Sequence, residues 1–196
     1  MKKLVGLTGK TGAGKSTVSA LLKEKGAYII DGDVVAREVL VDNNDLLNKL
    51  KKEFGEGIIN PDGTLNRHAL AKEAFLTPEK TEKLNSIMHP AINDIIFEEA
   101  EKAFSEYDVV IVDAAAIIES GFTEKSDYLI VVHAPREIRK ERIINRDGLS
   151  ETDAEIRING QKDDGFYLSK ADFVFNNFPP HDTQQQFLQL EKELFN

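Results

Sequence analysis

The sequence contains no cysteine among its 196 residues. This absence excludes disulfide bonds, zinc sites built on thiolates and a cysteine nucleophile, and it fits a reducing compartment. Long hydrophobic runs are missing too, because the longest, VVIVDAAAII, has ten residues and includes Asp113. About 18 apolar residues are needed to cross a bilayer, so we expect no membrane-spanning helix.

An excess of positive charge is also missing, since 25 Lys and Arg residues stand against 34 Asp and Glu residues, a formal net charge of -9. The surface as a whole therefore repels nucleic acid and anionic membranes, and an anionic ligand must be held by locally clustered basic groups. Too few apolar residues follow the initial MKK to form a signal peptide, so we expect a cytoplasmic protein.

Five short, nearly continuous apolar runs alternate with stretches that have helical spacing. This alternation is typical of a parallel α/β sheet with helices on both faces. The predicted strands are residues 4–8, 28–30, 109–112, 128–133 and 173–175.

Two intervals between these strands are too long for a single crossover helix, and we interpret residues 35–106 as a helical lobe and residues 136–167 as a mobile lid. The lid has a helix start at Ser150. The remaining core is about residues 1–34, 107–135 and 168–196, and it ends in an amphipathic helix. In the lobe, helical patterns cover residues 44–54, 65–75, 77–88 and 90–104, and the buried side of the closing helix carries Phe187, Leu190 and Leu194.

The stretch GKTGAGKS, from Gly9 to Ser16, lies directly between a predicted strand and a helical pattern and satisfies G-x-x-x-x-G-K-S. In this motif the glycines allow successive backbone amides to point inward, Lys15 reaches the β and γ phosphates, and the Ser16 hydroxyl binds magnesium. A helix that begins near Lys15 adds its positive end. The predicted ligands of the nucleotide phosphates are Gly9, Gly12, Ala13, Gly14, Lys15, Ser16 and Thr17.

Acidic residues follow two of the predicted strands. Asp31 and Asp33 are one residue apart after the second strand, so in an extended chain both carboxylates would project the same way, at the edge where ligands bind. One of them is a candidate to meet an acceptor hydroxyl, and turn formation or helix capping is the structural alternative. Asp113 ends the third strand, where we favour a role in holding magnesium or substrate over simple strand termination.

Three arginines, Arg139, Arg142 and Arg146, share one face of the helix predicted after the fourth strand. For Arg142 and Arg146 we favour neutralisation of the transferred phosphoryl group, because planar guanidinium groups match its oxygens. For Arg139 we favour a solvated charge that pairs with a glutamate. The candidate partners are Glu137, Glu141 and Glu155.

Further motifs follow in a fixed order: DGDVVARE, NPDGTLNRHALAKEAF, IMHPAI, RIINRDGLS, EIRINGQ and ADFVFNN. Together with GKTGAGKS they make the chain resemble the dephospho-coenzyme A kinases over essentially its full length. The resemblance implies an α/β, three-layer P-loop NTPase fold with a five-stranded parallel sheet, a helical substrate-binding insert and a lid. It also implies that ATP, with Mg²⁺, phosphorylates the ribose 3′-hydroxyl of a small-molecule substrate, dephospho-coenzyme A, in the last step of coenzyme A synthesis.

The resemblance further suggests roles for individual residues. Asp33 corresponds to the family's catalytic base, Arg157 to its lid arginine and Asn177 to an asparagine near the adenine of ATP. His89, before Pro90 at a predicted helix start, is either a contact to the acceptor nucleotide or a helix-entry residue. For Asn66 and Arg67 we favour a capping asparagine and a structural arginine. We expect a monomer or a weak homo-oligomer.

The chain departs from the family pattern in AAIIE at residues 115–119, in VDNN at residues 41–44, and at Arg139, where glutamine is common. Two other functions stay open at this level. One is a P-loop kinase for another small acceptor, such as a nucleoside monophosphate or a metabolite alcohol, and the other is a nucleotide-binding switch protein. The arginine-rich lid and the acid pair favour phosphoryl transfer over switching.

Overall fold

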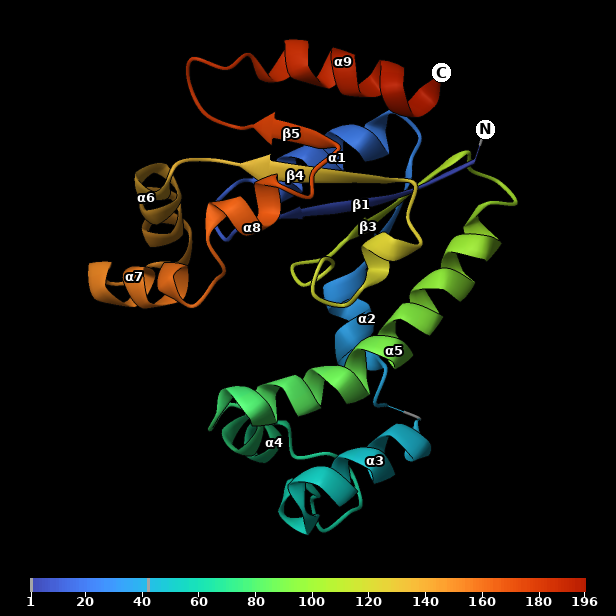
Figure 1. Cartoon of the computed structure of the whole chain (residues 1–196), viewed down its shortest axis with the longest axis vertical. Helices are drawn as coiled ribbons and strands as arrows, with labels where there is room; N and C mark the ends of the chain where they lie inside the picture. Colours follow the sequence, from blue (N-terminus) through green and yellow to red (C-terminus); the bar gives the residue numbers. More distant parts are fainter. Residues whose placement is uncertain (1, 42) are drawn as a thin grey trace. The chain divides into compact units, whose positions relative to one another are not determined.

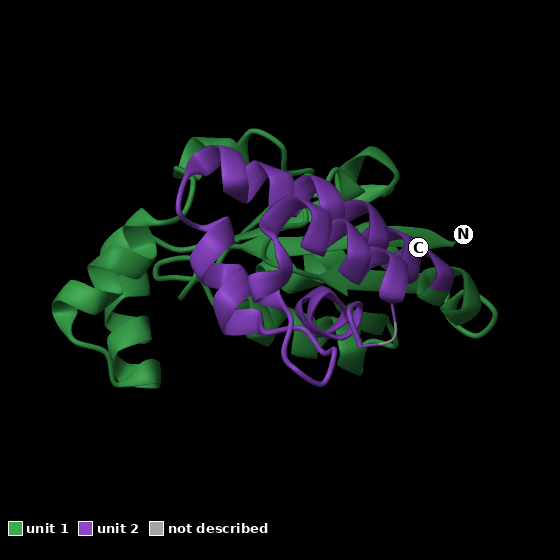
Figure 2. Ribbon diagram, turned by 90° about the horizontal axis from the view of Figure 1, so that it is seen from below, with its two compact units in different colours: residues 1–31, 99–196 green, residues 32–98 purple. Residues whose placement is uncertain are grey.

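The computed structural model describes residues 2–41 and 43–196. Asp42, part of the VDNN departure, lies outside the described residues. The chain divides into two compact units, one formed by the residues up to Asp31 together with 99–196 and the other by residues 32–98 (Figure 2).

The first unit is built on a five-stranded sheet in the order β2-β3-β1-β4-β5, and every neighbouring pair of strands is parallel (Figure 1). The predicted strands are confirmed, each to within one residue at either end, and so is the α/β class. The strands are Lys3–Gly9 (β1), Tyr28–Asp31 (β2), Val109–Asp113 (β3), Tyr128–His133 (β4) and Phe173–Asn176 (β5).

Helices α1 and α9 cover one face of this sheet (Figure 1). Val18 and Leu22 of α1 pack with Leu190 of α9 and with the strand side chains Val5 and Leu7 in one buried cluster. The predicted closing helix is confirmed, with Phe187, Leu190 and Leu194 buried. The helices of this unit are Lys15–Glu24 (α1), the 3-10 turn Phe122–Glu124 (η2), Arg136–Asp147 (α6), Glu151–Asn159 (α7), Asp164–Leu168 (α8) and Thr183–Phe195 (α9).

On the opposite face, the segment that follows β3 closes over β1. Ile117 and Phe122 are buried and lie against Gly6. The predicted helix start at Ser150 is confirmed, because the Ser150 hydroxyl caps α7 by accepting a 3.1 Å hydrogen bond from the amide of Asp153. None of the described helices is long and apolar enough to span a membrane.

The second unit is helical and has its own apolar core, which includes Leu46, Leu50 and Ile58. Asn66 caps α4 through a 2.9 Å hydrogen bond from the Ala69 amide, as predicted, and Arg67 donates to the Arg37 carbonyl. The elements are Gly32–Glu38 (α2), Asn44–Phe54 (α3), the 3-10 turn Glu56–Ile58 (η1), Arg67–Ala74 (α4) and Pro78–Ala103 (α5), whose last turn belongs to the first unit.

The prediction of two helices separated at His89–Pro90 is wrong, because α5 runs without a break from Pro78 to Ala103. A proline inside a helix removes one backbone hydrogen bond and costs about 3 kcal/mol. Apolar side chains on both sides of Pro90 pack against the same core, and their burial offsets this cost at roughly 1 kcal/mol or more each. These side chains are Leu84, Ile87, Met88, Ala91 and Ile92.

Candidate active site

The phosphate loop connects Gly9, the last residue of β1, to Lys15, the first residue of α1. Gly12 and Gly14 have φ values of 80° and 91°, a region that side-chain-bearing residues rarely adopt. A Cβ atom at Gly12 would lie 2.6 Å from the Arg139 carbonyl oxygen, and one at Gly14 would overlap the Asn177 amide group. Both positions therefore require glycine, for conformation and for space.

Lys15 and Asp113 meet at the carboxyl ends of the central strands. β3 lies next to β1 with Leu7 paired to Asp113, and the Asp113 carboxylate contacts the Lys15 ammonium group. Asp31, at the end of β2, is paired with Asp113 in the parallel register. The parallel sheet thus places an acid beside the lysine of the phosphate loop, although 98 residues separate the two in sequence.

Oxygen donors suited to magnesium are present at this end of the sheet. Ser16 lies in the first turn of α1, and Asp113 ends β3. The described residues contain no cluster of three His, Asp or Glu side chains that would hold a metal unaided. Magnesium is usually held by one or two protein oxygens together with substrate phosphates, so a hydroxyl and a carboxylate fit it.

Arg142 and Asn177 both bind the backbone of the phosphate loop. Arg142 donates to the carbonyl oxygens of Gly12 at 3.3 Å, Ala13 at 3.2 Å and Asn177 at 2.8 Å. The Asn177 side-chain amide donates to the Ala13 carbonyl at 2.9 Å. These bonds satisfy carbonyls that the bent loop leaves without partners, so in this conformation Arg142 braces the loop.

The prediction that Arg139 is a solvated charge paired with a glutamate is wrong. Its side chain is 2 % exposed, its Nε donates to the Ala134 carbonyl at 3.0 Å, and its guanidinium lies 3.8 Å from Asp164. The pKa of Arg139 is lowered by burial, an effect that Asp164 partly opposes. The α6 backbone at Arg139 packs against Gly12, and the side chain lies in a pocket with Lys10 and Asp164 instead of reaching a glutamate.

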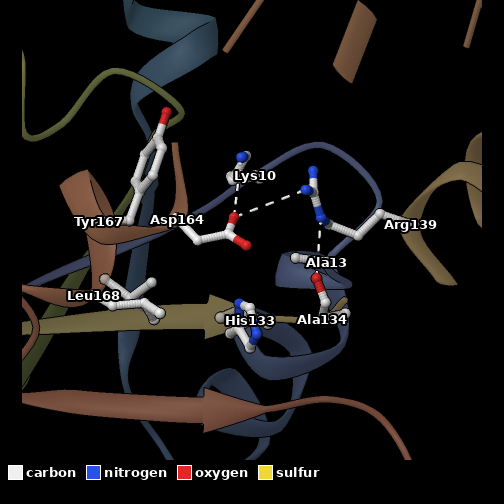
Figure 3. Close-up of a pocket in the computed structure, with 10 residues that line it drawn as sticks. Lys10, Ala13, His133, Ala134, Arg139, Asp164, Tyr167 and Leu168 are labelled. Carbon is white, nitrogen blue, oxygen red and sulfur yellow. Dashed lines mark hydrogen bonds and ion pairs between the residues drawn. The ribbon is translucent and has the colours of Figure 1, made fainter. Parts of the chain in front are cut away.

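Arg139 lines a small pocket beside the loop, where Lys10 and Arg139 point toward Asp164 (Figure 3). The Lys10 ammonium is 2.9 Å from the Asp164 carboxylate. Partial burial raises the pKa of Asp164, but the nearby Lys10 and Arg139 charges outweigh it and hold the pKa below its usual value. Burial lowers the pKa of His133 and raises that of Tyr167 to about 12. This group of side chains was not predicted from the sequence, because Lys10 is a variable motif position and Asp164 belongs to no motif.

Arg146 and Arg157 are held together by one carboxylate. Arg146 donates to Asp147 at 2.7 and 2.9 Å, and Arg157 donates to the same side chain at 2.7 Å. Both arginines are at least half exposed, with side-chain exposures of 60 % and 50 %. The hydrogen bond from Arg146 lowers the pKa of Asp147.

Asp33 and His89 belong to the second unit. The extended D-x-D geometry expected from the sequence is wrong, because α2 begins at Gly32, directly after the end of β2, and Asp33 lies in its first turn. A short helical turn replaces the extended step, so the alternation of strand side chains does not apply between Asp31 and Asp33. His89 lies in the interior of α5 rather than at a helix start.

A glycine-rich loop that runs from a central parallel strand into a helix, with its lysine set against an acid on the neighbouring strand, defines a P-loop nucleotide-binding protein. Comparison with known families gives the particular member. A dephospho-CoA kinase family model matches residues 3–180. The chain belongs to the dephospho-CoA kinase family.

Relatives with this name are similar over nearly the whole chain. A dephospho-CoA kinase of Corynebacterium jeikeium is 45 % identical over 88 % of this chain and 89 % of its own length. One of Listeria innocua is 39 % identical over 96 % of this chain and 95 % of its own length. Together with the family match, these relatives make the chain an ATP-using kinase, a transferase of phosphoryl groups.

Solved structures agree with the fold. A dephospho-CoA kinase of Campylobacter jejuni has a TM-score of 0.70 and 28 % identity, covering 98 % of this chain and 97 % of its own. A Thermus thermophilus protein has a TM-score of 0.82 and 28 % identity, covering 100 % of this chain and 98 % of its own. A shikimate kinase of Acinetobacter baumannii, at 15 % identity, has a TM-score of 0.54 and covers 99 % of this chain and 94 % of its own, which supports the P-loop kinase fold alone.

Proposed function

We propose that this kinase transfers the γ-phosphoryl group of ATP to the ribose 3′-hydroxyl of dephospho-coenzyme A and so completes coenzyme A synthesis. A bond forms between the 3′-oxygen and the γ-phosphorus, the bond from that phosphorus to the β–γ bridging oxygen breaks, and ADP leaves. The observation that supports this most is the glycine-rich phosphate loop in which Lys15 contacts Asp113, in a chain that belongs to this family.

On the donor side, we assign the nucleotide phosphates to the loop and to the first turn of α1. The amides at this helix start present partial positive charge, and Lys15 transfers from Asp113 to the β and γ phosphates. Asn177 and Arg142, which lie together behind the loop, are assigned to the adenine side of the site. The full set of proposed ATP ligands is Gly9, Gly12, Ala13, Gly14, Lys15, Ser16, Thr17, Arg142 and Asn177.

Magnesium is proposed as the metal of this site, held by Ser16 and Asp113 together with phosphate oxygens. When bound, it neutralises charge on the β and γ phosphates. Lys15 and the arginines complete this neutralisation. Arg146 takes the charge that develops on the transferred group, and Arg157 contacts the acceptor after both leave Asp147. Arg142 holds the loop that presents ATP.

On the acceptor side, we assign Asp33 to the ribose hydroxyl and His89 to the acceptor nucleotide. Asp33 follows Asp31 by two residues, so the covalent chain keeps it within about 7 Å of the strand end that pairs with Asp113. Asp33 orients the hydroxyl and takes its proton late, because the transition state of phosphoryl transfer is loose. Positioning therefore matters more than basicity.

An assay with labelled ATP and Mg²⁺ tests this proposal, with dephospho-coenzyme A beside a panel of nucleoside monophosphates and with mass spectrometry of the products. The Asp33→Asn variant is expected to lose turnover by on the order of 10²- to 10⁴-fold while its ATP affinity, measured by calorimetry, stays nearly unchanged. Asp45→Asn is the control, because Asp45 is an exposed acid in the first turn of a helix of the same unit.

Two results would contradict the proposal. Equal or faster transfer to a nucleoside monophosphate would assign the site to another acceptor. Normal turnover by the Asp33→Asn variant would remove Asp33 from the mechanism. Cytoplasmic location and a monomeric or weakly associating state are proposed along with the function, and light scattering across a concentration series tests the latter.

A further inference from the structure

The first half of the phosphate loop contacts the link between α7 and α8, residues 160–163, and the first residue of α8. The Thr11 amide donates to the Gln161 side-chain carbonyl at 2.9 Å. One residue earlier in the loop, the Lys10 ammonium is 2.9 Å from the Asp164 carboxylate. Two consecutive loop residues are therefore held by two side chains three positions apart, Gln161 in the link and Asp164 at the first position of α8.

The link itself has a defined position because a helix end stands on each side of it. The Gly160 amide donates to the Ile156 carbonyl at 3.0 Å and closes the last turn of α7. Asp163 caps the start of α8 by accepting a 2.8 Å hydrogen bond from the Phe166 amide. Gln161 is thus presented to Thr11 by a short connection with both ends anchored.

The second half of the loop is held by different groups. Arg142 and Asn177 bind the carbonyls of Gly12 and Ala13, and α6 packs against Gly12. Without Gln161, the loop would be braced at Gly12 and Ala13 but free to turn its Thr11 amide. A hydrogen bond of this type, part-buried, contributes a modest but measurable free energy.

We propose that Gln161 is a positioning residue of this kinase. It fixes Thr11, and through Thr11 it holds the loop amides in the arrangement that receives the nucleotide phosphates, while Asp164 does the same through Lys10. Gln161 acts through the loop rather than on the phosphate itself. Its loss therefore weakens ATP binding more than it slows the chemical step, because bound ATP restores the order that the free loop has lost.

The test is Gln161→Met, which keeps the length of the side chain and removes the hydrogen-bond acceptor. We expect the Kd of a non-hydrolysable ATP analogue, measured in the presence of Mg²⁺, to rise about three- to tenfold. This factor corresponds to the net contribution of one hydrogen bond. The KM for ATP rises by the same factor, while kcat and the KM for the acceptor stay within twofold. Hydrogen exchange at the Thr11 amide becomes faster in the free enzyme.

Asp163→Asn is the matched control, because it changes a side chain of the same link, keeps a residue that can cap α8 and leaves both contacts to the loop in place. It is expected to leave the Kd for the analogue unchanged. Asp164→Asn, which weakens the hold on Lys10, is a second variant and is expected to raise the same Kd. If Gln161→Met leaves both the Kd and the Thr11 exchange unchanged, or if Asp163→Asn raises the Kd equally, the proposal is overturned.

The turnover measurements rest on the proposed function, but the binding and exchange measurements do not, because they need no acceptor. Failure of the proposed acceptor would appear as absence of phosphorylated dephospho-coenzyme A in the wild-type enzyme, with the effect of Gln161→Met on the Kd intact. Failure of the proposed role of Gln161 would appear as an unchanged Kd in an enzyme that phosphorylates dephospho-coenzyme A normally.

Discussion

The two halves of α6 carry the same residue type at helical spacing, yet their arginines have different surroundings. In the first two turns of the helix, Arg139 is buried and Arg142 donates three hydrogen bonds to backbone carbonyls around the phosphate loop. At the far end, Arg146 is 60 % exposed and pairs with its neighbour Asp147. Spacing gave all three the same helical face, but only two of them have the loop packed against them.

This difference distinguishes arginines that stabilise the phosphate loop from arginines whose side chains can move to a ligand. A guanidinium that already satisfies buried carbonyls stabilises a loop and cannot leave without a cost, whereas an exposed ion pair contributes about 1 kcal/mol or less and exchanges readily. In the proposed mechanism, Arg146 and Arg157 can therefore exchange Asp147 for a phosphate, whereas the contacts of Arg139 and Arg142 around the loop stay in place.

Within α6, the largest expected effect comes from Arg146→Ala. Removing one positioned donor from the developing charge is expected to lower kcat about 10²- to 10³-fold, and the unfolding temperature should hardly change because the side chain is exposed. Steady-state kinetics and thermal unfolding measure the two effects. Arg136→Ala, an exposed arginine of the same helix, serves as the control. A folded Arg146→Ala enzyme with normal kcat would mean that Arg146 is a solvated surface charge with no part in phosphoryl transfer.

The next effect is on stability, from Arg139→Ala. Deleting a side chain that is 2 % exposed leaves a cavity and removes a charge that faces Asp164, so the free energy of unfolding is expected to fall by about 2–4 kcal/mol. The midpoint of urea unfolding measures this loss. Arg139→Met, which keeps most of the volume, should lose less. If Arg139→Ala and Arg146→Ala were equally stable, the buried Arg139 would contribute no more to the free energy of unfolding than the exposed Arg146.

The smallest effect concerns pH. Burial lowers the pKa of His133 in the folded protein, and the charged and titratable groups around it are Asp164, Arg139, Lys10 and His181. Between the folded pKa and the unfolded value of about 6.5, the unfolded chain binds more protons, so stability is present above this window and is lost as pH falls through it.

We therefore expect the melting temperature to fall slightly between pH 7.5 and pH 5.5, with a smaller fall in His133→Asn. Asp164 has a lowered pKa as well, but its contribution is lost only at more acidic pH, so the two groups separate. The same pH slope in both proteins would mean that His133 has no part in it.

Much of the fold was predictable because its signals are local. Strand runs such as 128–133 are short and apolar, and caps such as Ser150 and Asn66 satisfy amides within three residues. The break expected at Pro90 was wrong because a local rule about proline competed with the burial of Met88 and Ile92, which lie four positions apart on one face of a continuous helix. Local rules fail where packing supplies the larger free energy.

The sequence by itself determined the phosphate loop, since Gly12, Gly14 and Lys15 lie within a few residues and the loop geometry depends on backbone conformation. It also determined the family, through motifs spread along the chain. Only the tertiary structure decided that Asp113 meets Lys15, that Arg139 is buried, and that Gln161 holds Thr11. Those contacts join residues far apart in the chain, and they exist because parallel strands and their helices bring separate segments to one edge of the sheet.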